Sequence, residues 1–140
     1  MNGPIVVGTD GSDTATSAVL RAIQLAKAFD QTLHIVHAAA PQQVSDKKLP
    51  AEFRGTVVSG QDNVLDDVAS RARSAGVKVE VHSVHGDAAE AILDVAEQVD
   101  ADLIVVGNKG IGSAKRFVLG NIPSKVVHNS PCSTHVVHTT

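Results

Sequence analysis

The chain has 140 residues, a net charge of −3 and a hydrophobic fraction of 43% that includes three Phe and no Trp or Tyr. A chain of this length buries enough apolar surface to fold without a metal or disulfide staple, and its single cysteine excludes an internal disulfide. The shortage of aromatic rings and of clustered Lys and Arg argues against nucleic-acid binding, and no apolar stretch reaches the roughly 20 residues of a membrane span.

The first half of the chain alternates strand patterns with helix patterns. Apolar residues 5–7 predict a strand, which is followed by a turn-forming and helix-capping cluster at residues 9–13. Residues 15–29 then carry apolar side chains at spacings of three and four, as on one face of a helix, and residues 33–36 predict the next strand. The polar, irregular segment over residues 41–55 has the length of a lid or a partner-binding loop.

The second half continues this alternation. Its expected elements are a helix over residues 56–75, a strand over 77–84, a helix that starts with a capping box of Asp87 and Glu90, a strand over 103–106, a short helix that starts near Asn121 and Pro123, and a strand over 134–138. Gly76 is suited to end the first of these helices, and the uninterrupted apolar run at 103–106 is typical of a strand covered on both faces.

Strands that alternate with helices predict right-handed βαβ units, and hence an α/β fold in which a doubly wound sheet lies between two layers of helices. For five mainly parallel strands, the expected order is 3-2-1-4-5. The sequence shows no internal repeat or domain boundary, and no signal peptide precedes the first predicted strand. We therefore expect a single cytoplasmic domain over residues 1–140.

Three glycine-bearing turns follow the predicted strands on one side of the sheet. Ligands of open α/β sheets bind beyond the carboxyl ends of the strands where the strand order reverses, and the first and fourth strands flank that point here. Residues 8–12 and 107–113 leave these strands and are rich in glycine, which lets backbone N–H groups approach a ligand. Residues 120–124 lead into a helix whose N-terminus suits an anion. The alternative is that these glycines only form tight turns and helix caps.

Two generic phosphate-binding fingerprints are not met. A Walker A loop needs Lys and then Ser or Thr after its last glycine, where the chain has Ser113 and Ala114 after Gly112. The dinucleotide fingerprint needs a third glycine at the position that Lys115 occupies.

A more specific pattern covers nearly the whole chain. Gly107-x2-Gly110-x9-Gly120 follows an apolar strand, and Val7-Gly8-Thr9-Asp10-Gly11-Ser12 stands at the end of the first one. Together with the segments at residues 86–92 and 130–137, these motifs resemble the ATP-binding branch of the universal stress protein family. The resemblance implies a flavodoxin-like sandwich of the adenine-nucleotide alpha-hydrolase type, usually a homodimer, that binds ATP with Mg²⁺ or Mn²⁺.

The resemblance also implies roles for individual residues. Asp10 would hold the ribose, Ala38 or its neighbour would meet the adenine through the backbone, and Gly107 would approach the sugar. The amides of Gly110, of Gly120 and of the residue after it would bind the phosphates, as turn N–H groups can do. The full candidate set for nucleotide binding is Gly8, Thr9, Asp10, Ala38, Val106, Gly107, Gly110, Gly120, Asn121 and Ile122.

The phosphate turn departs from the family pattern at two positions. Asn121 stands where the family usually has Ser or Thr, and Pro123 stands where a second hydroxyl is often found. Asn121 still suits a helix start and donates from its amide, and Ser124 offers a nearby hydroxyl. Family members with Pro at this turn and a similar Val-His-Thr-Thr ending resemble cyclic-AMP binders, so cyclic AMP is the alternative ligand.

These features favour a dimeric nucleotide-binding stress sensor or regulator over an enzyme. Ser12 is better explained as a helix cap than as a nucleophile, and the sequence offers neither a clear general base nor an arginine finger. We therefore predict no catalytic residue. The alternatives are a slow ATP hydrolase or phosphotransferase that uses Asp10 and a metal ion, and a nucleotide-free scaffold whose dimer surface or loop at residues 41–55 binds a partner.

The seven histidines raise the question of a metal site formed by protein side chains alone. His34 with His82, or His37 with His85, would be neighbours across the second and third strands. A spacing of three along one strand points side chains to opposite faces, so no single strand offers a chelating pair. We therefore expect no such metal site.

The C-terminal segment suggests how two copies would associate. The strand over 134–138 is expected at an edge of the sheet, where unpaired backbone groups invite pairing with another chain. We predict a homodimer formed by antiparallel pairing of this strand across a two-fold axis. Cys132, just before this strand, is expected to be a buried and inert thiol.

Overall fold

The computed structural model describes residues 2–9, 13–39, 59–108 and 120–138. Its helices and strands alternate along the chain. They are β1 (Ile5–Thr9), α1 (Asp13–Phe29), β2 (Leu33–Ala39), α4 (Ser59–Ser74), β3 (Val79–His85), α5 (Ala88–Gln98), β4 (Leu103–Gly107), α6 (Asn121–Asn129) and β5 (Ser133–Val137). Within the described residues, no helix is both long enough and apolar enough to cross a membrane.

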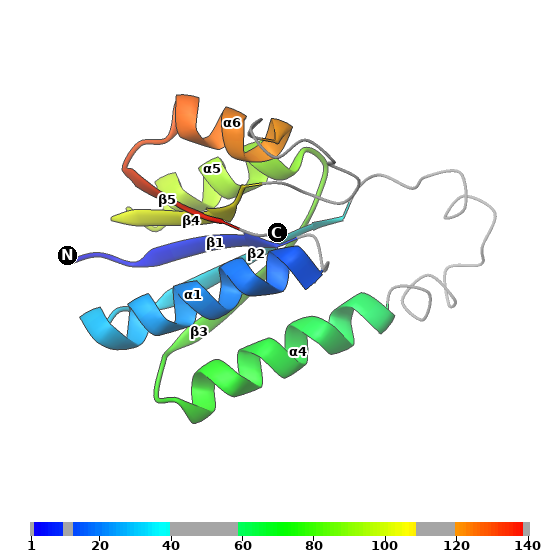
Figure 1. The fold of residues 1–140 in the computed structure, drawn as a ribbon, viewed down its shortest axis with the longest axis vertical. Helices are drawn as coiled ribbons and strands as arrows, with labels where there is room; N and C mark the ends of the chain where they lie inside the picture. Colours follow the sequence, from blue (N-terminus) through cyan, green and yellow to red (C-terminus); the bar gives the residue numbers. More distant parts are fainter. Residues whose placement is uncertain (1, 10–12, 40–58, 109–119, 139–140) are drawn as a thin grey trace.

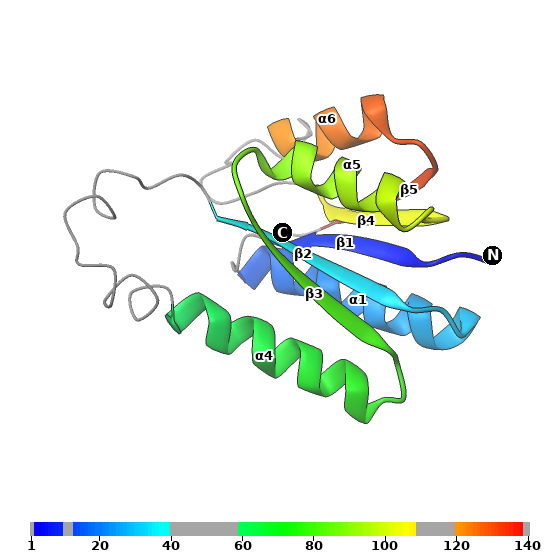
Figure 2. The same ribbon diagram turned by 180° about the vertical axis from the view of Figure 1, so that it is seen from behind.

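The strands form one five-stranded sheet in the order β3-β2-β1-β4-β5, and all neighbouring pairs are parallel. The predicted α/β class and strand order are thereby confirmed. Helices α1 and α4 cover one face of the sheet, and α5 and α6 cover the other, so the sheet is the middle of three layers (Figure 1; Figure 2). Because the strands are parallel, all their carboxyl ends lie at the same edge of the sheet.

Two hydrophobic clusters fill the space between the layers, one on each face of the sheet. Ile5 and Val7 of β1 belong to the cluster beneath α1 and α4, whereas Val6 belongs to the cluster beneath α5 and α6. This alternation follows from the two-residue period of a strand. The central strands are buried on both faces, as the apolar run of β4 predicts, and Ile104 and Val105 are 0% exposed.

Local signals place several element ends. Gly76, just after α4, has a φ of +89°, a conformation that glycine adopts readily. Asp87 caps α5, because its Oδ1 accepts a hydrogen bond from the backbone N–H of Glu90 at 3.0 Å. Strand β2 is longer than its apolar run predicts, since it stays paired with β3 as far as Ala39 and His85.

The structure corrects two details near the C-terminus. Strand β5 spans Ser133–Val137 rather than residues 134–138, although it lies at the sheet edge as predicted. Cys132 is half-buried rather than fully buried. Burial raises the pKa of its thiol, which keeps the thiol protonated near neutral pH and agrees with an unreactive cysteine.

Candidate functional site

The sheet opens at its carboxyl edge between β1 and β4. The ladder between these two strands ends at the pair of Val7 and Val105. Beyond that pair, Gly8 and Thr9 continue in the ladder with β2, and residues 106–107 continue in the ladder with β5. The gap that results lies where the strand order reverses, which is the usual ligand-binding position in such sheets.

Three members of the predicted nucleotide-binding set border this gap, and a fourth, Ala38, lies nearby at the same edge of the sheet. Thr9 ends β1, Gly107 ends β4, and Ala38 lies one residue beyond the last pairing of β2 with β1. Val106 is buried among the side chains of the cluster beneath α5 and α6, so it can offer a ligand only its backbone. The fold therefore gathers residues from three separate segments at one edge.

Gly8 has a packing role of its own. A Cβ built at this position would collide with Cδ1 and Cγ1 of Ile92 on α5. Ile92 is itself 2% exposed and belongs to the cluster beneath α5 and α6. The missing side chain at Gly8 thus allows α5 to lie close to the end of β1, and packing explains this glycine without any ligand.

Two backbone hydrogen bonds at Asn108 join the end of β4 to β5 and to the start of α6. The N–H of Asn108 donates to the carbonyl oxygen of Val137 at 3.0 Å, and the N–H of Gly120 donates to the carbonyl oxygen of Asn108 at 2.9 Å. The amide of Gly120, expected to face a phosphate, is therefore used within the protein. Since the N-cap is Gly120, no side chain caps the helix, and the following amides belong to Asn121 and Ile122.

Some predicted functional residues lie outside the described residues. They are Asp10, Ser12, Gly110 and residues 41–55. Their roles stay predictions.

Comparison with known proteins identifies the family. The family model described as "Universal stress protein family" matches residues 1–138. The chain belongs to the universal stress protein family. A universal stress protein of Mycobacterium tuberculosis (strain H37Rv) is 36% identical over 141 residues, which cover 97% of this chain and 96% of the relative.

Solved structures of other proteins share the fold. One, described as a universal stress protein in complex with cAMP, is 33% identical with a TM-score of 0.73, and the match covers 99% of this chain and 98% of that one. The protein MJ0577 is 24% identical with a TM-score of 0.83 over 100% of this chain and 98% of that one, which shows the fold alone. These matches agree with the three-layer sandwich described above.

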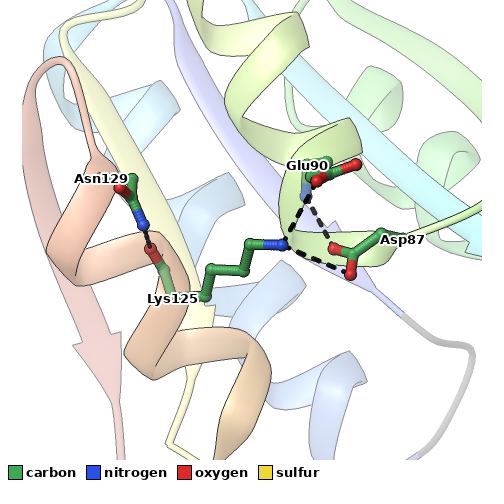
Figure 3. A network of polar contacts seen from close by, with 4 residues as sticks. All are labelled: Asp87, Glu90, Lys125 and Asn129. Atoms are coloured by element: carbon green, nitrogen blue, oxygen red, sulfur yellow. Dashed lines mark hydrogen bonds and ion pairs between the residues drawn. The ribbon is translucent and has the colours of Figure 1, made fainter.

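In this universal stress protein, an ion-pair network joins α6 to the start of α5 at the carboxyl edge (Figure 3). Nζ of Lys125 lies 3.5 Å from Oδ2 of Asp87 and 3.4 Å from Oε1 of Glu90. The hydrogen bond from the backbone of Glu90, joined by the charge of Lys125, lowers the pKa of Asp87. The cap is predictable from the sequence, whereas the role of Lys125 is not, because 38 and 35 residues separate Lys125 from its two partners.

A second polar cluster lies at the opposite edge of the sheet, at the amino ends of β2 and β3. Nδ1 of His34 lies 3.0 Å from Nε2 of His82 and 3.2 Å from Oε2 of Glu80. The predicted proximity of His34 and His82 is confirmed. Histidines spaced by three along a strand do not point to Glu80, whereas a residue spaced by two from His82 shares its face of the strand.

The rest of the described chain holds no comparable cluster. His34, Glu80 and His82 form the one group of three or more His, Cys, Asp or Glu side chains there whose ligand atoms converge. The other predicted pair, His37 and His85, lies in the same two strands but belongs to no such group.

Proposed function

We propose that this universal stress protein binds an adenine nucleotide in the gap between β1 and β4, and that it acts as a dimeric sensor or regulator rather than as an enzyme. The observation that carries the proposal is the end of the ladder at Val7 and Val105, at the point where the strand order reverses. The family member in complex with cAMP, 33% identical to this chain, supports an adenine nucleotide as the ligand.

The nucleoside would lie across the ends of β1, β2 and β4. The backbone at Ala38 lies one residue beyond the last pairing of β2 with β1, and its carbonyl oxygen can accept a hydrogen bond from the amino group of an adenine ring. Thr9 and Gly107 flank the space for the ribose. Asp10 is the proposed acceptor for the ribose hydroxyls, because it directly follows β1 and carries a carboxylate.

The start of α6 favours a ligand with one phosphate group. The amide of Gly120 is already used, Pro123 has no N–H, and the N–H of Ser124 donates to the carbonyl oxygen of Gly120 at 3.0 Å. In the described part of the turn, the amides of Asn121 and Ile122 remain for an anion. A pair of adjacent amides matches the single phosphate of cyclic AMP, which is therefore our first candidate.

ATP with Mg²⁺ or Mn²⁺ is the second candidate. It is favoured by the spacing of Gly107, Gly110 and Gly120, which resembles that of ATP-binding family members. The longer phosphate chain would follow residues 109–119, which lie outside the described residues. A bound divalent cation would offset the charge of the phosphates.

Calorimetric titration of nucleotide-free protein with cyclic AMP, and separately with ATP and MgCl₂, tests this proposal. The decisive variant is Asn121→Pro, which removes one amide from the start of α6. Gly120 has φ −61° and ψ 167°, the extended conformation that a residue before proline prefers, and the first position of a helix accepts proline well. Asn121→Ala is the matched control, because it keeps the amide and removes only the side chain.

We expect cyclic AMP to bind the wild type and Asn121→Ala with similar affinity. A hydrogen bond to a charged group contributes about 1.5–3 kcal/mol, so Asn121→Pro should bind roughly tenfold to a hundredfold more weakly. Stronger binding of ATP would select the second candidate. If titration with neither nucleotide gives a heat of binding, the proposal is contradicted. The function would then be assigned to a surface of the dimer.

A further inference from the structure

The cluster of His34, Glu80 and His82 lies at the edge of the sheet opposite the proposed nucleotide site. In the ladder between β2 and β3, His34 is opposite Glu80, and His82 follows two residues later on the same face. Each side chain offers one ligand atom, and these atoms all lie within 4.8 Å of one another. The register of two neighbouring strands thus brings two imidazoles and a carboxylate together.

The burial of this cluster distinguishes it from a group of solvated surface charges. The side chain of His34 is 6% exposed, whereas that of Glu80 is 65% exposed, so the cluster is closed on one side and open to solvent on the other. Nδ1 of His34 lies within hydrogen-bond distance of both His82 and Glu80. One ring nitrogen carries at most one proton, so Nδ1 of His34 cannot donate a full hydrogen bond to both neighbours. A cation between the three groups would accept a lone pair from each.

We propose that His34, Glu80 and His82 bind a divalent transition-metal ion, for which Zn²⁺ is the best match. Imidazole nitrogens and a carboxylate oxygen are ligands that Zn²⁺ prefers, whereas Ca²⁺ and Mg²⁺ prefer oxygen ligands alone. Ligands held at about 2.0–2.1 Å in a tetrahedron lie about 3.3 Å apart, close to the 3.0 Å and 3.2 Å that separate Nδ1 of His34 from His82 and Glu80, and all three ligand atoms lie within 4.8 Å of one another. Water would take the fourth position, on the open side.

The position of the cluster in the sheet gives a bound ion a structural role. The ion would connect β2 to β3, which is an edge strand. Because the site requires the folded register of these strands, zinc binding would stabilise the folded protein.

Zinc chloride is titrated into the full chain after metal removal with EDTA, in a buffer that does not chelate zinc. We expect a site of one ion per chain that requires Glu80 and His82. Glu80→Gln keeps the shape of an exposed side chain, and His82→Gln removes a ligand from an edge strand. Loss of groups that only orient a ligand weakens metal binding about 10–100-fold, so loss of a ligand itself should weaken zinc binding at least tenfold.

His85→Gln is the matched control, because it lies on the same strand but on the opposite face. It should keep the affinity of the wild type. Zinc should also raise the melting temperature of the wild type and of His85→Gln, but not that of Glu80→Gln or His82→Gln. Zinc binding that is absent from the wild type, or equal in all four proteins, would overturn the proposal. Titration of the same variants with nucleotide tests the proposed function independently, so failure of the zinc proposal can be distinguished from failure of the nucleotide proposal.

Discussion

Nζ of Lys125 on α6 lies 3.5 Å from Oδ2 of Asp87, the residue whose other carboxylate oxygen caps α5 (Figure 3). One carboxylate therefore satisfies an amide in the first turn of α5 and attracts a cation on the neighbouring helix. Since α6 also carries the amides proposed to bind a phosphate, this contact ties the placement of those amides to α5.

Replacing Asp87 separates its two contributions. Asp87→Ala removes both the helix cap and the ion pair, and should lower the free energy of unfolding by about 1 kcal/mol through the cap alone. Asp87→Asn keeps a good cap and loses only the charge, so it should retain most of the stability. Urea unfolding of the three proteins measures this difference, and equal losses in the Ala and Asn variants would show that the cap is unimportant.

The stabilising effect of the Asp87 charge should depend on pH. The hydrogen bond from Glu90 and the charge of Lys125 lower the pKa of Asp87 below its usual 3.8. A carboxyl group with a lower pKa in the folded state stabilises the fold while it is ionised, and that stabilisation is lost as the pH falls through the folded-state pKa. The advantage of the wild type over Asp87→Asn should therefore be present at pH 7 and shrink below about pH 4. Urea unfolding at both pH values measures it, and an advantage that persists at low pH would argue against this origin.

Gly8→Ala should destabilise the protein by forcing a methyl group against Ile92. Overpacking of this kind typically costs about 1–3 kcal/mol, and Ile92→Ala alone should cost about 2–5 kcal/mol through the cavity that it leaves. Because the smaller side chain at position 92 gives the new methyl group room, the double variant should lose less stability than the sum of the single losses. Thermal and urea unfolding test this coupling.

The same double variant shows whether Gly8 also approaches the ligand. If the glycine serves packing alone, Gly8→Ala combined with Ile92→Ala should bind cyclic AMP as well as Ile92→Ala does. A selective loss of affinity in the double variant would assign Gly8 a direct role at the nucleotide.

Edge pairing through β5 predicts a dimer in solution. Antiparallel pairing across a two-fold axis brings each residue of β5 near the equivalent segment of its copy, so Thr134→Lys would place like charges close together. We expect light scattering after size exclusion to give a dimer mass for the wild type and a smaller mass for the variant. A monomeric wild type at high protein concentration would refute this mode of association.

Features with local causes were predictable from the sequence. The end of α4 shortly before Gly76 depends on the conformational freedom of glycine, and the cap of α5 at Asp87 depends on a hydrogen bond across three residues. The extension of β2 to Ala39 was not predictable in this way, because it depends on pairing with β3, a strand from a distant part of the chain.

The same distinction between local and long-range causes applies to the candidate sites. By itself the sequence determined the α/β class, the strand order and the family, because hydrophobic periodicity and glycine motifs each lie within a short segment of the chain. Only the tertiary structure decided that the ladder of β1 and β4 ends at Val7, that the amide of Gly120 is used by Asn108, and that Glu80 joins two histidines. The first and third depend on the register between strands far apart in the chain, which is set by packing across the sheet. The second depends on where the fold brings the start of α6 against the end of β4.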